Sequence, residues 1–198
     1  MSPAPRQITP ADIMPMADYG RVRRDHRKKL VEVKKKRRVH IGPHVSLYFE
    51  NYDTMWAQVH EMLFIERGGD EQVEGELSAY NPLIPQGNEL VATMMIEIDE
   101  ERPRRRILAT LGHVEDTIEL RFAGQIVKAV PEDDLDRTTP EGKTSSVHFL
   151  HFTFTPEQKK AFETAGTEVM LAITHHNYRH MALLSEDSRA ALASDFSS

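Results

Sequence analysis

The stretch spanning residues 39–66 constrains the fold most, because a strand pattern is followed there directly by a helix pattern. Apolar residues occupy alternate positions over residues 39–50, interrupted by Gly42-Pro43, which predicts a half-buried strand with a bend. Residues 51–54 end the strand and supply side-chain oxygens that can cap a helix over residues 54–67. A strand and a helix in one short unit indicate a mixed fold.

Further strand patterns follow, and most of the polar segments between them are short. The predicted strands cover residues 90–98, 106–111, 117–122, 126–130, 147–154 and 169–174. Short connections are typical of an antiparallel meander. We therefore expect an α+β fold with a largely antiparallel curved sheet, or a partly open barrel, of about six strands, with helices at both termini and packed on one face.

Helix signals stand near both ends of the chain. Thr9-Pro10 opens a short helix, and apolar residues at helical spacing predict a longer helix over residues 18–38. Thr155-Pro156-Glu157-Gln158 is a capping box with proline at the first helical position, so it predicts a helix over residues 156–165.

The predicted helix over residues 54–67 has two different sides. The apolar side, which we expect to pack on the sheet, holds Met55, Trp56, Val59, Met62 and Leu63, and the polar side holds Thr54, Gln58 and Glu61. Glu66 projects into the apolar side, where a carboxylate needs an Arg, a metal or a proton, unless it lies at a frayed end and bends to water. The acidic segment that follows predicts a second helix, which Asn81-Pro82 ends.

The composition predicts a soluble protein of the cytoplasm. The 198 residues are 39% hydrophobic and 28% charged, and no apolar run approaches the roughly 18 residues of a membrane span. The first ten residues have no apolar signal segment. The chain has no Cys, which excludes disulfides, thiolate metal sites and a self-ligated iron–sulfur cluster.

Histidines and carboxylates are therefore the candidate metal ligands, and this combination suits iron, manganese or zinc. The candidate ligands are Glu50, Glu61, Glu66, His175 and His176, with Gln58, His44 and Tyr48 as candidates for a polar site beside them. These residues bind a divalent metal only if the fold brings them together, and a lone histidine is more often a surface or hydrogen-bonded core residue. The sequence does not decide between these possibilities.

Standard catalytic motifs are missing from the sequence. His60-Glu61 begins like the zinc site H-E-x-x-H, but Phe64 stands where the second histidine must be. There is no G-x-x-x-x-G-K-[ST] phosphate loop, no G-x-G-x-x-G dinucleotide motif and no G-x-S-x-G nucleophile elbow. The sequence leaves open whether the protein is an enzyme.

Charge is segregated along the chain. Residues 21–38 hold eleven Lys or Arg against two acids, a local charge of +9, although the whole chain carries −6. The candidate contacts to an anionic partner are Arg23, Arg24, Arg27, Lys34, Lys35, Lys36, Arg37 and Arg38. Clustered bases release counterions from nucleic-acid phosphate, but this helix can also lie across the acidic part of its own chain or be a solvated face. We assign it to a helical arm, residues 1–38, joined to an α+β body, residues 39–198.

One more pattern runs through the first half of the chain. It consists of Phe49-Glu50-Asn51, Thr54, Gln58, Glu61-Met62-Leu63, Glu66, Glu76-Leu77, Tyr80-Asn81-Pro82 and Leu83-Ile84-Pro85. The pattern resembles an uncharacterised bacterial family known as a domain of unknown function. Members of that family tend to be encoded near rubrerythrin-like proteins and iron–sulfur oxidoreductases, so the resemblance implies a role in redox or peroxide defence and no particular reaction.

Two functions are compatible with these observations. The first is an accessory or partner protein of a redox or peroxide-defence system, which binds an iron–sulfur oxidoreductase or a rubrerythrin-like protein and holds a divalent metal through His and carboxylates. The second is a nucleic-acid-binding regulatory protein that uses the basic helix over residues 18–38. The negative total charge and the missing aromatic residues for base stacking count against the second. The absence of Cys fits a partner or metal-handling component better than an electron carrier.

Overall fold

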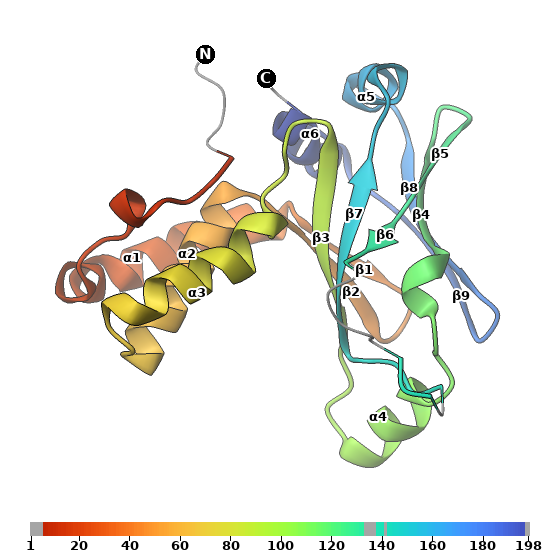
Figure 1. Ribbon diagram of the computed structural model, residues 1–198. Helices are drawn as coiled ribbons and strands as arrows, with labels where there is room; N and C mark the ends of the chain where they lie inside the picture. Colours follow the sequence, from red (N-terminus) through yellow and green to blue (C-terminus); the bar gives the residue numbers. More distant parts are fainter. Residues whose placement is uncertain (1–5, 133–137, 141, 197–198) are drawn as a thin grey trace.

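Two antiparallel sheets pack face to face, and three helices extend from the outer side of one of them (Figure 1). The structure is a computed structural model that describes residues 6–132, 138–140 and 142–196. It confirms the α+β class, the antiparallel pairing and the helices near both termini. In this part of the chain the strands form sheets of five and four strands that do not close into a barrel, where about six strands in one sheet had been expected.

The first sheet has the strand order β1, β2, β3, β7, β6, and the second has the order β5, β4, β8, β9. All neighbouring pairs are antiparallel. The strands of the first sheet are β1 (Arg38–Ile41), β2 (Val45–Glu50), β3 (Glu89–Ile96), β6 (Val130–Pro131) and β7 (Val147–Thr153). Those of the second are β4 (Ile118–Phe122), β5 (Gln125–Lys128), β8 (Val169–His175) and β9 (Tyr178–Leu183).

The core between the sheets is apolar and closed. At one end it holds a cluster of aromatic rings, Phe122, Phe154, Phe162 and Phe196, with centroids 4.7 to 5.8 Å apart. Helices α5 (Pro156–Glu163) and α6 (Glu186–Ala193) cover this end with the short helix η4 (Ser194–Phe196). The predicted capping box is confirmed, because the Thr155 side chain accepts a hydrogen bond from the Gln158 N–H.

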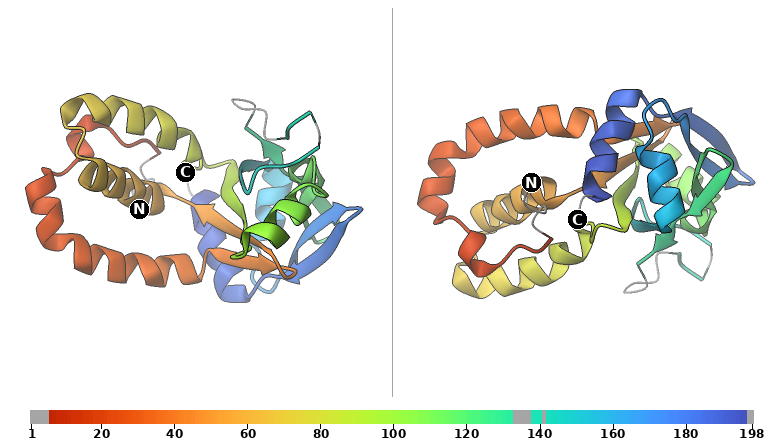
Figure 2. Two further views of the ribbon diagram at one scale, coloured as in Figure 1. Left: turned by 90° about the horizontal axis from the view of Figure 1, so that it is seen from below. Right: turned by 90° about the horizontal axis from the view of Figure 1, so that it is seen from above.

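The three longest of the described helices form a separate layer. Helix α2 (Tyr52–Glu66) lies between α1 (Met16–Lys35) and α3 (Asp70–Tyr80), as both views of Figure 2 show. An extended segment, residues 6–15, which we call the N-terminal strap, runs along them and includes the short helix η1 (Pro10–Asp12). We call α1, α2, α3 and the strap the helical layer. No helix in the described ranges is long and apolar enough to cross a membrane.

The helical layer has its own small core. Its buried members are Ile8, Met55, Val59, Leu63, Leu77, Leu83, Ile84 and, from β3, Val91. Val59 and Leu63 are buried as predicted, but Trp56 and Met62 are only half-buried. The predicted apolar side of α2 therefore packs mainly among helices and meets the sheet at Val91 and Phe149, because α1 and α3 cover much of the surface that the sheet was expected to cover.

Residues 39–50 form a hairpin and not the single bent strand that was predicted. Ile41 of β1 pairs with Val45 of β2 across a turn at Gly42, whose φ of 67° lies in the left-handed region that favours glycine. A Cβ at Gly42 would also meet the Tyr178 hydroxyl at 2.6 Å. Gly42-Pro43, which was predicted as a bend within one strand, is therefore a turn between two antiparallel strands.

Two other predicted segments are corrected. Residues 106–111 were predicted as a strand, but residues 106–108 are the end of helix α4 (Glu101–Leu108) and residues 109–111 follow it without forming a strand. Ile107, Leu108 and Leu111 fit helical spacing as well as they fit a strand. No strand was predicted after residue 174, but His175 pairs with Tyr178 and the chain returns at once as β9. The remaining short helices are η2 (Asn81–Leu83) and η3 (Val114–Thr117).

Candidate functional site

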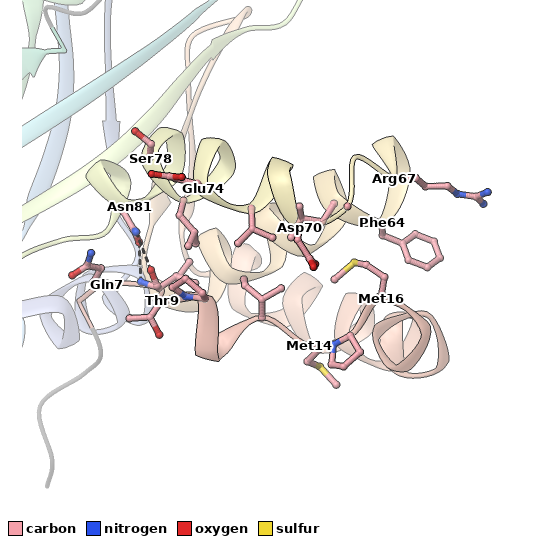
Figure 3. A pocket seen from close by; sticks show the side chains of 18 of the residues that line it. Gln7, Thr9, Met14, Met16, Phe64, Arg67, Asp70, Glu74, Ser78 and Asn81 are labelled. Atoms are coloured by element: carbon pink, nitrogen blue, oxygen red, sulfur yellow. Dashed lines mark hydrogen bonds between the residues drawn. The ribbon is translucent and has the colours of Figure 1, made fainter.

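A wide groove lies in the helical layer between the N-terminal strap, the end of α2 and α3 (Figure 3). We call it the strap groove. Its volume is about 1350 Å³, and its apolar lining includes Ile8, Ile13, Met16, Leu63, Val73 and Leu77. Small-molecule sites usually have volumes of roughly 300–1,000 Å³, so the strap groove has room for a larger ligand.

The first end of the strap is fixed to the segment that follows α3. The Ile8 N–H donates to Asn81 Oδ1 at 2.8 Å, and Asn81 Nδ2 donates back to the Ile8 carbonyl at 2.9 Å (Figure 3). The Arg6 guanidinium donates to the Pro85 carbonyl at 2.9 Å, and the Gln86 amide donates to the Arg6 carbonyl at 3.0 Å. These hydrogen bonds fix the position of the strap, which forms one wall of the groove.

The middle of the strap is fixed to α2. Trp56 Nε1 donates to the Asp12 carbonyl at 3.0 Å, and the fully buried His60 accepts the Met14 N–H at Nε2 over 3.0 Å. His60 must then carry its proton on Nδ1, which donates to the Trp56 carbonyl at 2.7 Å. Burial lowers the pKa of His60 below its ordinary value, which favours this neutral form.

The opposite wall is one face of α3. Asp70, Val73, Glu74, Leu77 and Ser78 follow helical spacing and all line the groove. Helix α3 carries four acids and no Lys or Arg. Within the described ranges, Asp70 and Glu74 form no ion pair or hydrogen bond through their carboxylates. The groove therefore combines an apolar floor with an acidic rim.

Glu61, a predicted metal ligand, holds α1 and α2 together. Arg23 donates to its two oxygens at 2.8 and 2.7 Å, and the Tyr19 hydroxyl donates to Oε1 at 2.8 Å. The hydrogen bond from Arg23 is the main cause that lowers the pKa of Glu61, and it also raises the pKa of Arg23. A carboxylate held in this way serves as a structural anchor between the two helices.

Glu50, the second predicted ligand, is buried at the base of α2. Its oxygens accept hydrogen bonds from the Thr54 hydroxyl at 2.6 Å and the Thr93 hydroxyl at 2.8 Å. Two hydroxyl donors keep this carboxylate satisfied inside the protein. Glu50 and Glu61 belong to different hydrogen-bond networks, one at the junction with β3 and the other at the junction with α1.

The remaining candidate ligands lie elsewhere. Glu66 is exposed at the end of α2 and accepts a hydrogen bond from Gln72 at 2.7 Å, so the alternative in which it bends to water fits the structure. His175 is buried at the end of β8, and its ring lies 4.4 Å from that of the exposed His176. Its Nδ1 accepts the Asn177 N–H and its Nε2 donates to the Gly112 carbonyl. Burial lowers the pKa of His175.

The structure does not bring the five candidate metal ligands together. Figure 1 shows α2 outside the first sheet, whereas β8 is a strand of the second sheet. Across residues 6–132, 138–140 and 142–196, no three His, Asp or Glu side chains are grouped so that they could hold a metal ion.

The three polar-site candidates are also separate. Gln58 on α2 donates to the Tyr80 hydroxyl at 3.4 Å. The Tyr48 hydroxyl donates to Glu97 at 2.9 Å, and His44, in the turn before β2, lies against Tyr178 with ring centroids 6.4 Å apart. These residues are distributed between the helical layer and the sheets, and they form no common site.

The basic residues fall into two groups. Arg23 pairs with Glu61, Lys35 with Glu32, Arg37 with the buried Asp195, and Arg38 with Glu97. Arg24, Arg27, Lys34 and Lys36 are exposed and form no ion pair with any residue that the structure describes. The basic segment is therefore partly engaged by the acids of its own chain and partly free.

Sequence reasoning missed the strap groove. The signals were present in Ile8, Ile13 and Met16, which are apolar residues in a segment that was assigned only a short helix. Their partners Val73 and Leu77 stand some sixty residues later, and helical spacing indicates that a helix has an apolar side without saying what lies opposite it. His60 was considered only as a fragment of a zinc motif, although its structural role is to hold the strap.

A mixed α+β protein with a wide, largely apolar groove in its helical layer is the class that this geometry defines. The chain belongs to the family described as "Protein of unknown function (DUF3501)", whose model matches residues 7–196. It is also similar to a crystal structure of a protein of unknown function from Burkholderia pseudomallei K96243, with 37% sequence identity and a TM-score of 0.88 over 96% of this chain and 98% of that chain. No curated protein matches the chain. The resemblance to a family of unknown function is thus confirmed.

Proposed function

We propose that the protein is an accessory protein of a redox or peroxide-defence system and that it works by holding a segment of a partner protein in the strap groove. The observation that carries the proposal is the groove itself, an apolar hollow of about 1350 Å³ with charged groups at its rim. Grooves with an apolar floor and a polar rim are typical of peptide recognition. The redox setting rests on the resemblance described above, and an iron–sulfur oxidoreductase or a rubrerythrin-like protein is the partner we expect.

The way in which the strap is held supports a preformed site. Four of its hydrogen-bond partners, Asn81, Gln86, Trp56 and His60, come from outside the strap. A groove whose walls are fixed before binding loses less conformational entropy when a partner enters. The exposed or half-buried apolar side chains inside it, such as Val73 and Met16, gain burial only in the complex.

The test is a binding titration with a matched pair of variants. The purified iron–sulfur oxidoreductase and rubrerythrin-like protein of the same organism are titrated into the wild-type protein, Ser78→Trp and Ala79→Trp. Ser78 lines the groove and its exposed neighbour Ala79 does not, so only the first indole fills the groove. We expect one of the two proteins to bind the wild type and Ala79→Trp but to bind Ser78→Trp at least about tenfold more weakly.

Two results would contradict the proposal. If neither redox protein binds the wild type, the proposed role in a redox system is excluded. If both Trp variants bind equally well, the strap groove is excluded as the binding site.

Metal binding stays a prediction for Glu50, Glu61 and the His175 region. Metal analysis of protein purified without an affinity tag, repeated on Glu50→Gln and Glu61→Gln, tests it directly. A stoichiometric metal that either substitution removes would support it. Substoichiometric metal that neither substitution changes would dispose of it.

A second candidate function, nucleic-acid binding, is favoured by the free bases of α1. Arg27 and Lys28 each stand about one turn after Arg24 on the exposed side of the helix, and Lys34 stands about two turns after Arg27. If these residues contact phosphates, the logarithm of the binding constant should fall with the logarithm of the salt concentration by about 0.9 per phosphate contacted.

Gel shifts at low salt with duplex DNA test this alternative, with Arg24→Glu/Lys28→Glu as the variant and Arg21→Glu as the control. Arg21 already pairs with Asp18 on the same helix. Binding that the double variant abolishes would support the alternative. No shift at low salt would reject it.

A further inference from the structure

The acidic rim of the strap groove indicates what kind of segment the groove takes. Asp70 in the first turn of α3 also stabilises the positive end of its own helix, so its position has an ordinary explanation. Glu74 has none, because it stands in the middle of α3 with no described partner. Both carboxylates line the groove, one turn apart. Among the described lining residues, Arg67 is the one Lys or Arg side chain, so the rim is predominantly acidic.

The walls of the groove also restrict the conformation of the occupant. They are made by two helices and by a strap whose backbone is already bonded to Asn81, Gln86 and other residues outside it. An extended peptide would find few free backbone groups here and would leave its own N–H and C=O groups without protein partners. A helix satisfies its backbone internally and needs only an apolar side to contact the groove.

The dimensions fit a short helix. The eleven residues of α3 extend for about 16 Å at 1.5 Å per residue, which is the length of about three helical turns. The flexible side chains of Met14 and Met16 stand on the opposite side of the groove and can adjust to different apolar surfaces.

We propose that the strap groove takes an amphipathic helix of a partner protein, with its apolar side on Val73 and Leu77 and with Lys or Arg residues one turn apart facing Asp70 and Glu74. The inference rests on the proposed function and names the chemistry of the partner at that same site. The helix of the partner protein is expected to lie along α3, because its Lys or Arg residues then meet Asp70 and Glu74 at the same one-turn spacing.

Two synthetic helical peptides of about four turns test this, one with Lys and one with Glu at the same edge positions beside an identical apolar side. At low ionic strength the Lys peptide should bind at least about ten times more tightly than the Glu peptide, and added salt should reduce the difference. Glu74→Gln should weaken binding of the Lys peptide about threefold, and Asp70→Asn/Glu74→Gln about tenfold. Glu71→Gln is the matched control, because Glu71 belongs to the same helix but does not line the groove, and it should have almost no effect.

The outcomes separate the two proposals. If both peptides bind equally and Ser78→Trp weakens both, the groove binds helices without charge selection, and only the present inference fails. If the Lys peptide binds Ser78→Trp as well as it binds the wild type, the peptide lies elsewhere and the inference is overturned. The proposed function fails independently, when Ser78→Trp leaves the binding of the redox proteins unchanged.

Discussion

The core between the sheets and the core of the helical layer are built from similar apolar residues, but the side chains at their edges differ in exposure. Between the sheets, Leu47, Leu120, Phe152 and Phe162 are completely buried, and aromatic rings close one end. In the helical layer, Val59 and Ile8 are just as buried, but the side chains around them become half-exposed toward the strap groove. The comparison shows that the core between the sheets is closed and that the helical layer leaves apolar side chains half-exposed, which is the surface that the proposed docking site requires.

The largest expected effect is on the core between the sheets. Phe162→Ala should lower the free energy of unfolding by about 3–5 kcal/mol, because a fully buried ring in contact with three others is replaced by a cavity. Phe64→Ala, at the half-buried edge of the strap groove, should cost less than about half as much. Urea denaturation measures both, and equal losses would mean that the two regions do not differ as described.

The next largest effect is expected at Glu61, which joins α1 and α2. Glu61→Gln should cost about 1–2 kcal/mol, because Arg23 and Tyr19 lose a charged acceptor in a largely shielded site. Arg21→Gln removes an exposed ion pair with Asp18 and should stay within about 0.5 kcal/mol. Thermal unfolding of the two variants distinguishes them, and a Glu61→Gln midpoint at the wild-type value would refute the anchor.

Two histidines, one in the helical layer and one on the first sheet, should respond to pH in opposite directions. The folded-state pKa of His60 is lowered by burial from 6.5, so its contribution to stability is complete above pH 6.5 and is lost as the pH falls through the folded value. His151 on β7 has a raised pKa, mainly through its hydrogen bond to Glu89 and also through Glu132. Its contribution is complete below pH 6.5 and is lost as the pH rises through the folded value.

Urea midpoints measured from acid to mildly alkaline pH check both signs. His60→Gln should remove the part of the pH dependence that lies below pH 6.5, and His151→Gln the part that lies above it. A wild-type slope that either variant leaves unchanged would contradict the assignment for that histidine.

The smallest expected effect on stability belongs to the groove. Ser78→Trp and Ala79→Trp alter exposed positions of α3 and should both unfold within about 0.5 kcal/mol of the wild type. Their binding should nevertheless differ strongly. A destabilised Ser78→Trp would show that the groove is already filled by packed side chains.

Local signals made much of the fold predictable. The capping box at Thr155 and the Asn81-Pro82 stop mark helix ends by short-range chemistry, and the structure has both. The strand misread over residues 106–111 has too few apolar residues to separate a period of two from a period of 3.6. The missed strand β9 carries the apolar residues Met181 and Leu183 at solvent-exposed positions. Its sequence therefore lacks the alternation of buried apolar and exposed polar residues that normally identifies a strand.

The candidate site was less predictable because it depends on distant contacts. Glu61 was predicted as a metal ligand, but its partner Arg23 stands on another helix and was assigned to a surface for an anionic partner. Asn81 was read as a helix stop, and its pairing with Ile8 across 73 positions has no sequence signature. Side-chain types indicated the available chemistry, and only the fold shows which of them meet.

The most direct test of the central claim, that the strap groove is the docking site, uses the methyl groups of methionine. Met14 and Met16 line the groove, Met94 is fully buried in the sheets, and Met170 and Met181 stand exposed on the second sheet. We expect NMR spectra of methyl-labelled protein to show shifts of the Met14 and Met16 signals when the redox protein that binds is added, with the other three unchanged. Shifts of Met170 and Met181 without shifts of Met14 and Met16 would place the partner on the second sheet and contradict the account.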